Sequence, residues 1–252
     1  METNIEVLKK KAKQLRKDVL DQALEEGECH LGGSFSEIEI LISLYDSILK
    51  PEDKFILSKG HASIPFYLLL KERGYNPEMK THPDLDEKNG IYATTGSLGH
   101  GLPMGLGMAM ARKKLKKEGK IYVLMSDGEC QEGTTWESAL IASHHKLDNI
   151  VAIVDRNYIQ ALDRTENVLS LGNLGNKFAA FGWETTSING HLFDELSYAF
   201  SKKVVEKPHV IIANTIKGKG ISYMENNPEW HARRVTVERL KGAYEELKFG
   251  EF

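Results

Sequence analysis

Residues 121–157 read IYVLMSDGECQEGTTWESALIASHHKLDNIVAIVDRN, and this stretch decides the fold. Within it, residues 121–125 and 150–154 are short apolar runs rich in β-branched side chains, which is typical of buried strands. Residues 132–147, between the two runs, have the length and the composition of a helix. Two strands joined in this way by a helix lie parallel in one sheet. The stretch therefore predicts an α/β fold with a central, mostly parallel sheet flanked by helices.

Polar side chains follow both predicted strands at their carboxyl ends. Ser126, Asp127 and Gly128 come directly after the first strand, and Asp155 and Asn157 follow the second. Because ligands of open parallel sheets gather at this edge, we expect a carboxylate and an amide to face one crevice. Carboxylate, amide and carbonyl oxygens suit Mg²⁺ or Ca²⁺ better than zinc or copper, and Mg²⁺ usually shares its coordination shell with waters and phosphates. The pattern therefore favours a divalent cation together with a phosphate-bearing cofactor.

Spacing adds to this interpretation, since Asp, Gly and Asn taken singly are also ordinary turn residues. Asn157 stands 30 positions after Asp127, and the segments QEG and WE lie between them. This arrangement resembles the thiamine diphosphate motif of transketolases, with Ser126 in place of its usual first glycine. The resemblance implies the thiamine-diphosphate-binding fold of that family. It also implies thiamine diphosphate as cofactor, bound together with Mg²⁺ or Ca²⁺.

The resemblance assigns ligands to this cofactor. Asp127, Asn157 and the main-chain carbonyl of Ile159 would hold the divalent cation. Gly128 and Glu129 would lie beside the diphosphate. A glycine lets the backbone approach an anion closely, and the N-terminal amides of the helix that follows face the same anion.

Four histidines occupy positions at which the family binds sugar or diphosphate. His30 precedes a Gly-Gly pair between two predicted helices, and the resemblance assigns it to the donor sugar. His61 follows a short predicted strand over residues 55–57 and matches a histidine that contacts the diphosphate. His82, in a Thr-His-Pro segment, fits a histidine that contacts the sugar, and His231 fits one near diphosphate and sugar. An ordinary surface, capping or core role stays open for these side chains.

The glycine-rich segment TTGSLGHG, residues 94–101, leads into a helix rich in glycine and methionine. It does not match a dinucleotide-binding loop, because no convincing strand precedes it and no acidic residue follows at the expected distance. The resemblance places Gly96, Ser97 and Leu98 along the thiamine, with His100 where the family has Gln. Because the helix that follows is apolar on nearly every side, we expect it to be buried, often against another subunit.

The remaining periodicities complete the predicted order of elements. We expect further helices over residues 5–26, 36–49, 64–73, 169–181, 194–205 and 235–247, and further strands over residues 183–188 and 209–215. With 252 residues and no linker rich in Pro, Gly or Ser, the chain is expected to form a single diphosphate-binding domain over residues 1–252.

Composition excludes several classes of function. The formal net charge is −3 and the basic residues are scattered, which argues against a nucleic-acid surface. No signal peptide and no membrane-spanning run is recognisable, so we expect a soluble, cytoplasmic protein without a membrane partner. Cys29 and Cys130 form no metal-binding pattern, and reduced thiols are expected.

The resemblance extends over nearly the whole chain but only over the N-terminal half of a complete transketolase. In the family the other half carries the pyrimidine-binding domain, with a glutamate that helps to activate the cofactor. The resemblance therefore implies a subunit of a split transketolase, which transfers a two-carbon ketol unit from a ketose or ketose phosphate to an aldose or aldose phosphate. The chain would be catalytically silent without its partner subunit, and the expected assembly is two copies of each chain.

Two glutamates of the predicted helix after Asp127 have a place in this assembly. The family places Glu132 and Glu137 at the subunit contact, in a chain of carboxylates that links two active sites. A solvated helix face is the other interpretation of these residues.

Two further interpretations of the whole chain stay open. One is the α-subunit of a thiamine-dependent 2-oxo-acid dehydrogenase, although the histidines His30, His61, His82 and His231 fit sugars better. The other is a non-catalytic protein that binds thiamine diphosphate, since half of an active site is lacking.

Overall fold

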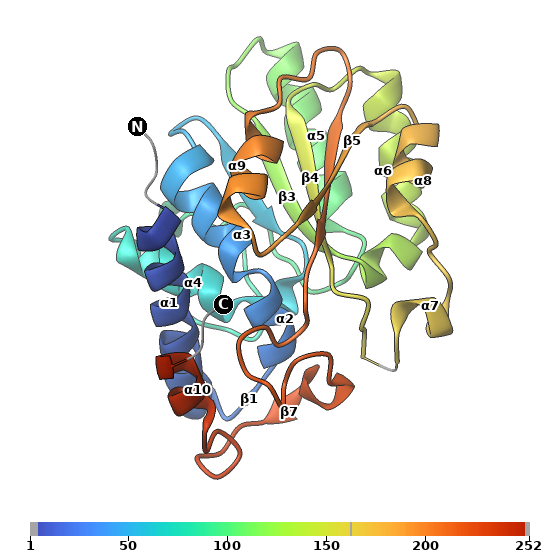
Figure 1. Cartoon of the computed structure of the whole chain (residues 1–252). Coiled ribbons are helices and arrows are strands. Elements are labelled where there is room, and N and C mark those ends of the chain that lie inside the picture. Colours follow the sequence, from blue (N-terminus) through green and yellow to red (C-terminus); the bar gives the residue numbers. More distant parts are fainter. Residues whose placement is uncertain (1–4, 162, 250–252) are drawn as a thin grey trace.

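Five strands form one parallel sheet in the computed structural model, which describes residues 5–161 and 163–249 (Figure 1). Their order across the sheet is β2, β3, β4, β6, β5, and every neighbouring pair runs parallel. The strands are β2 (Lys54–Leu57), β3 (Ile121–Ser126), β4 (Ile150–Arg156), β5 (Glu184–Asn189) and β6 (His209–Asn214). β3 and β4 pair from Ile121 opposite Ile150 onward, so the predicted strand–helix–strand unit and the parallel sheet are confirmed.

Helices cover both faces of this sheet, because the side chains of each strand alternate between two hydrophobic clusters (Figure 1). In β3, Tyr122 and Leu124 belong to one cluster, whereas Val123 and Met125 belong to the other. The first cluster is covered by α1 (Ile5–Glu26), α2 (Leu31–Ser36), α3 (Ile38–Ser43), α4 (Ile64–Glu72), α9 (Phe193–Ser201) and α10 (Ala243–Phe249). The second is covered by α5 (Gly101–Lys114), α6 (Gly133–His144) and α8 (Leu174–Ala180), and the short helix α7 (Thr165–Val168) follows β4.

A two-stranded antiparallel ribbon, separate from the main sheet, brings two distant loops together. Its strands are β1 (Glu28–Cys29) and β7 (Arg233–Arg234). His30 directly follows β1, and β7 begins two residues after His231. The ribbon therefore places two of the predicted site histidines next to each other, although they are remote in the sequence.

The helix expected over residues 36–49 begins earlier and is divided. Between α2 and α3, Glu37 adopts φ −100° and ψ 0°, and a π-helical turn over Leu44–Ile48 follows α3. Glu37 is buried and its carboxylate forms an ion pair with Lys59 at 3.0 Å. The break thus coincides with a buried carboxyl group that a regular amphipathic pattern does not reveal.

Other predicted helices are also shorter than expected: α6 ends at His144 and α9 ends at Ser201, before the expected ends at residues 147 and 205. The helix expected over residues 169–181 is reduced to α8, because the side chain of Asn173 caps its N-terminus. Of the helix expected over residues 235–247, only the part after Gly242 lies in α10, and Gly242 has a left-handed φ of +89° that stops a helix before it.

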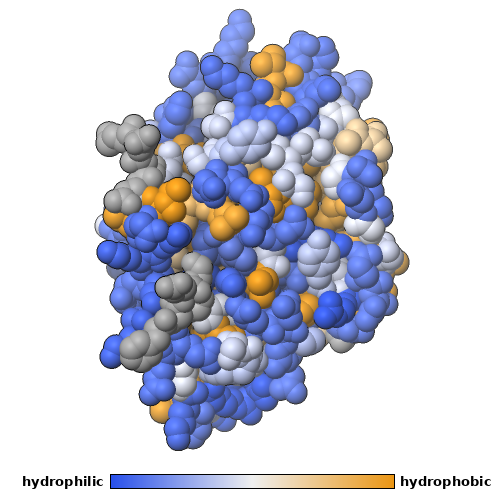
Figure 2. All heavy atoms as spheres, viewed as in Figure 1, coloured by the Kyte–Doolittle hydropathy of each residue, from blue (hydrophilic) through white to orange (hydrophobic). Residues whose placement is uncertain are grey.

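The surface has a mostly hydrophilic face (Figure 2) and a second region, on α5 and α6, where apolar residues are exposed. The face drawn in Figure 2 is mostly hydrophilic, with small, separate hydrophobic patches. On α5, Gly107 and Ala111 are exposed while the opposite side packs into the core, so this chain alone does not bury the helix on every side. On the adjoining α6, Leu140 is 60% and Ile141 40% exposed. Within residues 5–161 and 163–249, none of the helices has the length and apolarity needed to cross a bilayer.

Candidate functional site

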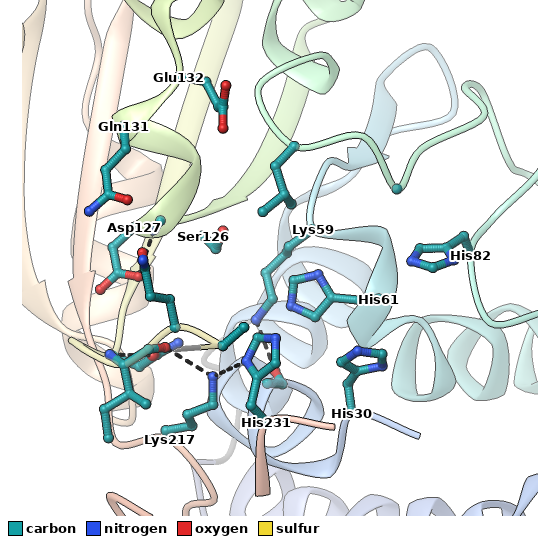
Figure 3. Close-up of a pocket in the computed structure, with 18 residues that line it drawn as sticks. His30, Lys59, His61, His82, Ser126, Asp127, Gln131, Glu132, Lys217 and His231 are labelled. Atoms are coloured by element: carbon teal, nitrogen blue, oxygen red, sulfur yellow. Dashed lines mark hydrogen bonds between the residues drawn. The ribbon is translucent and has the colours of Figure 1, made fainter. Parts of the chain in front are cut away.

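A pocket of about 320 Å³ lies at the carboxyl ends of the strands, where the sequence predicts a ligand (Figure 3). Its walls come from α2 and from the loops that follow β2, α4, β3, β4 and β6. The pocket brings together these predicted residues: His30, His61, His82, Gly96, Leu98, Asp127, Gly128, Glu132, Asn157, Ile159 and His231. It does not include Ser97, Glu129 or Glu137.

Asp127 is held rigidly at the end of β3. Its Oδ1 accepts a hydrogen bond from the backbone N of Gly128 at 2.8 Å. Its Oδ2 accepts from the backbone N of Tyr158 at 2.7 Å, from Thr165 Oγ1 at 3.1 Å and from Arg156 Nη1 at 3.3 Å. Burial raises the pKa of Asp127, and the Arg156 guanidinium opposes this change. These donors aim the carboxylate at the pocket without using every lone pair.

The loop after β4 presents two more oxygen atoms. Asn157 Nδ2 donates to Asp155 Oδ2 at 3.2 Å, and Asn157 Oδ1 accepts from the backbone N of Ile159 at 3.2 Å. Tyr158, between them, has a left-handed φ of 65°, which turns the chain sharply. The carbonyl of Ile159 accepts a hydrogen bond from Lys217 Nζ at 2.9 Å.

These residues fit a divalent cation. Asp127, Asn157 and Ile159 supply one carboxylate, one amide oxygen and one carbonyl, and all three line the pocket. In the part of the chain that the structure describes, His, Cys, Asp and Glu form no group of three suited to a metal ion, so a site here depends on this mixed set. Hard oxygen donors of this kind suit Mg²⁺ or Ca²⁺ with waters and phosphates completing the shell.

Three histidines form a compact group on the opposite wall. The ring centroids of His30, His61 and His231 lie 5.1 to 5.5 Å apart. Burial lowers the pKa of His30 to about 4 and that of His231 to about 3, with help from the positive charge of Lys217, and burial also keeps the pKa of His61 well below its ordinary value. The three imidazoles are therefore neutral near pH 7.

One of these histidines has an unsatisfied polar atom. Nδ1 of His30 is buried and, within the described residues, has no hydrogen-bond partner. A buried polar atom without a partner costs free energy, which favours an uncharged ring at this position.

His82 lines the pocket from the loop after α4 and packs against Gly96. A Cβ at Gly96 would stand only 2.8 Å from His82 Cδ2, and Gly96 has φ +138°. A glycine is therefore required for this approach.

Two buried lysines, Lys59 and Lys217, also line the pocket, and the sequence analysis assigns no role to either of them. Lys217, after β6, donates from Nζ to the carbonyl of Ile159 at 2.9 Å and to His231 Nδ1 at 2.8 Å (Figure 3). Burial and the neighbouring charge of Lys59 lower the pKa of Lys217 to about 8. Lys59 follows the end of β2 and Lys217 follows the end of β6. This position after a strand was the sequence feature that could have indicated a place in the pocket.

Lys59 is enclosed by a buried network. Its Nζ donates to the carbonyl of Gly33 at 2.8 Å and to Asp155 Oδ2 at 2.5 Å, and it pairs with Glu37. Burial alone would lower the pKa of Lys59, but Asp155 and Glu37 raise it above its ordinary value. Burial would raise the pKa of Asp155, yet the Lys59 ammonium holds it below its ordinary value, while burial raises the pKa of Glu37 to about 8. The Lys59–Asp155 pair is therefore ionised.

Glu129, which is predicted to lie beside the diphosphate, has its side chain turned away from the pocket. Glu129 is fully buried, and its carboxylate accepts from the backbone N of Gly99 at 2.9 Å and of Ser126 at 3.0 Å, and from the hydroxyl of Ser58. Burial raises the pKa of Glu129. Its side chain joins three segments below the pocket and does not form the pocket wall.

The other predicted residues outside the pocket are exposed. Ser97 Oγ lies 3.2 Å from Nδ1 of His100, and both residues face solvent. Glu132 lines the rim of the pocket, whereas Glu137 is exposed on α6.

Comparison with known proteins identifies the family to which this arrangement belongs. Residues 7–250 match the family described as transketolase, thiamine diphosphate binding domain. The chain belongs to the transketolase family. It is 37% identical to one subunit of the apulose-4-phosphate transketolase of Phocaeicola vulgatus, over 96% of this chain and 94% of that protein. It is 36% identical to the 6-deoxy-6-sulfo-D-fructose transketolase subunit SqwG of a Clostridium species, over 96% of each.

A solved transketolase shares the fold. The transketolase of Campylobacter jejuni superposes with a TM-score of 0.87 at 30% identity, over 98% of this chain. The predicted thiamine-diphosphate-binding fold is thereby confirmed. This chain spans 43% of the length of that transketolase chain.

Proposed function

We propose that this chain is the cofactor-binding subunit of a two-chain transketolase. The observation that carries the proposal is the pocket in which Asp127, Asn157 and the carbonyl of Ile159 lie opposite the neutral histidines. Support comes from the relatives named as transketolase subunits, of which this chain covers 94% to 96%. The reaction is the transfer of a two-carbon ketol unit from a ketose or ketose phosphate to an aldose or aldose phosphate.

The first task of the chain is to bind a cation and a diphosphate. Asp127, Asn157 and Ile159 supply oxygen ligands to Mg²⁺ or Ca²⁺. The Lys217 ammonium, which lies 2.9 Å from the carbonyl of Ile159, would supply positive charge to the diphosphate. Gly128 lets the backbone approach the diphosphate, and a Cβ at this position would crowd Gln160 Oε1 at 3.0 Å.

The second task is to orient a sugar. Thiamine diphosphate, when bound, stabilises the negative charge that develops as a ketol unit is cleaved from a ketose. Nδ1 of His231 accepts a hydrogen bond from Lys217, so its proton lies on Nε2 and can be donated to a hydroxyl. His30, His61 and His82 add neutral or exposed ring nitrogens in the same pocket, which suits the many hydroxyls of a sugar.

The third task is to assemble with a partner. The apolar outer surface of α5 and α6, with Leu140 and Ile141 exposed, is the contact surface toward other subunits. The partner is the C-terminal transketolase subunit with the pyrimidine-binding domain, and the assembly contains two copies of each. Glu132 at the pocket rim and Glu137 on α6 lie along this contact.

The test is reconstitution. The purified chain, alone and mixed with a C-terminal transketolase subunit, is given thiamine diphosphate and Mg²⁺, and ketol transfer between sugar phosphates is followed. We expect turnover only with both chains. Robust turnover by this chain alone would contradict the two-chain proposal, and decarboxylation of a 2-oxo acid in place of ketol transfer would contradict the reaction.

A matched pair of variants tests the cation site. Asp127→Ala should weaken Mg²⁺-dependent cofactor binding by well over tenfold, since a charged ligand is lost. Asp194→Ala, an exposed aspartate on α9, should have no effect. Equal cofactor affinity in the two variants would rule out Asp127 as a ligand.

A further inference from the structure

Asp155 is fully buried below the pocket floor and does not line the pocket. Its Oδ1 accepts a hydrogen bond from the hydroxyl of Thr215. Its Oδ2 accepts from three donors: Lys59 Nζ at 2.5 Å, Ser36 Oγ at 2.6 Å and Asn157 Nδ2 at 3.2 Å. One carboxylate thus joins α2, the loop after β2, the end of β4 and the end of β6.

This contact selects an orientation of the Asn157 amide. A carboxylate paired with an ammonium only accepts hydrogen bonds, so it binds the NH₂ end of an amide and repels the carbonyl end. The carbonyl oxygen of Asn157 must then point away from Asp155, where it meets the backbone N of Ile159 at 3.2 Å. With the opposite orientation, two acceptors would face each other at Asp155 and two donors would face each other at Ile159.

We propose that Asp155 is a positioning residue that turns the carbonyl end of Asn157 toward the divalent cation. This inference rests on the proposed function, since it takes Asn157 as a cation ligand. Asp155 touches neither the pocket nor a bound ion, and it acts through the side chain of Asn157. Residues that orient metal ligands in this way typically contribute 10-fold to 100-fold to metal affinity.

The experiment measures Mg²⁺ affinity by calorimetry in the assembled enzyme at saturating thiamine diphosphate. Asp155→Asn presents a donor or an acceptor equally well, so only the contact with the backbone N of Ile159 still selects the amide orientation, and we expect Mg²⁺ to bind about 10-fold more weakly. Ser36→Ala is the matched control, because it removes a hydrogen bond from the same carboxylate oxygen without touching Asn157. Its Mg²⁺ affinity should stay within about threefold of wild type.

A second variant separates positioning from a merely structural role. Asn157→Asp has two equivalent oxygens, so its orientation needs no selection, and in the double variant D155N/N157D the amide introduced at position 155 can donate to the new carboxylate. The double variant should therefore recover most of the Mg²⁺ affinity that D155N loses. A double variant as weak as D155N alone would overturn the proposal.

The outcomes keep the two proposals apart. Wild-type binding of Mg²⁺ together with unchanged affinity in D155N would overturn the role of Asp155 and leave the proposed function intact. Absence of cofactor-dependent Mg²⁺ binding in the wild type would overturn the proposed function itself. Should D155N fail to fold because Lys59 loses its buried partner, D155N/N157D, which keeps a carboxylate in the same network, is measured in its place. An Mg²⁺ affinity close to that of the wild type is expected, and a loss of about tenfold or more would overturn the role of Asp155.

Discussion

Replacing Lys217 by methionine should stabilise the free protein and weaken cofactor binding at the same time. The Lys217 side chain is almost completely buried, and burial lowers its pKa from 10.5 to about 8. The buried environment therefore disfavours the charged form of Lys217 in the free protein, and a bound anion would stabilise that charge. Methionine has a similar length and removes the charge.

The structure sets the size of both effects. At 1.36 kcal/mol per pKa unit, a charged Lys217 costs the free protein about 3 kcal/mol near pH 7. In the variant, the carbonyl of Ile159 and Nδ1 of His231 lose their hydrogen-bond donor, which lowers the free energy of unfolding by about 2 kcal/mol. We therefore expect the free energy of unfolding to rise by about 1 kcal/mol. Loss of a charged hydrogen bond to the diphosphate, about 1.5–3 kcal/mol, should weaken thiamine diphosphate binding about 10-fold to 150-fold.

The pH dependence gives this prediction a clear sign. Because the pKa of Lys217 is lower in the folded than in the unfolded state, the unfolded chain binds more protons between pH 8 and pH 10.5. The stability of the wild type should therefore gain a rising contribution across this range, and Lys217→Met should lack it. Urea unfolding at several pH values measures the difference.

Lys219→Met serves as the control, because Lys219 lies in the same loop, outside the pocket, and pairs with Glu225 at 3.4 Å. It should follow the wild type in both assays. The reasoning is refuted if Lys217→Met binds thiamine diphosphate as tightly as Lys219→Met, or if the two variants respond to pH in parallel.

Three further predictions concern the side chains around the pocket. Glu129→Ala should lower the free energy of unfolding by about 3–5 kcal/mol in urea titrations, because three buried donors lose their acceptor; a loss below about 1 kcal/mol would contradict this. The pKa values of His30, His61 and His231 are lower in the folded chain, so the unfolded chain binds more protons as the pH drops. The melting temperature should therefore fall between about pH 6.5 and about pH 4. A variant with Gln at all three positions should show a smaller change of melting temperature over the same range. Glu137→Gln should leave the fold of this chain unchanged but weaken assembly in sedimentation experiments. Wild-type assembly in this variant would indicate that Glu137 is only a solvated residue on the helix surface.

The proposed cation ligands Asp127 and Asn157 could be placed at one pocket from the sequence, because each follows an apolar run that is buried on both faces of the sheet. Asp127 and Asn157 are polar residues at the ends of β3 and β4, and parallel strands bring such ends together. Lys59 and Lys217 follow β2 and β6 in the same way, but lysine is normally a solvated residue and its type does not signal burial. Their role depends on partners that are remote in the sequence.

The position of the Glu129 side chain could not be predicted from the sequence either. It directly follows Gly128, so its place in the sequence pointed to the pocket. In the structure it lies in the 3₁₀-helical turn Gly128–Gln131, which directs its carboxylate back toward the amides of Ser126 and Gly99. Gly99 is brought there by the packing of α5 on the sheet, which local patterns do not contain.

The central place of β4 has a consequence for how the chain folds. One edge of β4 pairs with β3, which precedes it, but the other edge pairs with β6, so residues 157–214 must be synthesised before that edge is covered. Until then an apolar strand exposes unpaired amides and carbonyls, a surface that favours association between chains. Parallel pairs so distant in sequence also form slowly. The newly made chain is therefore most prone to aggregate after β4 has emerged and before β6 has docked.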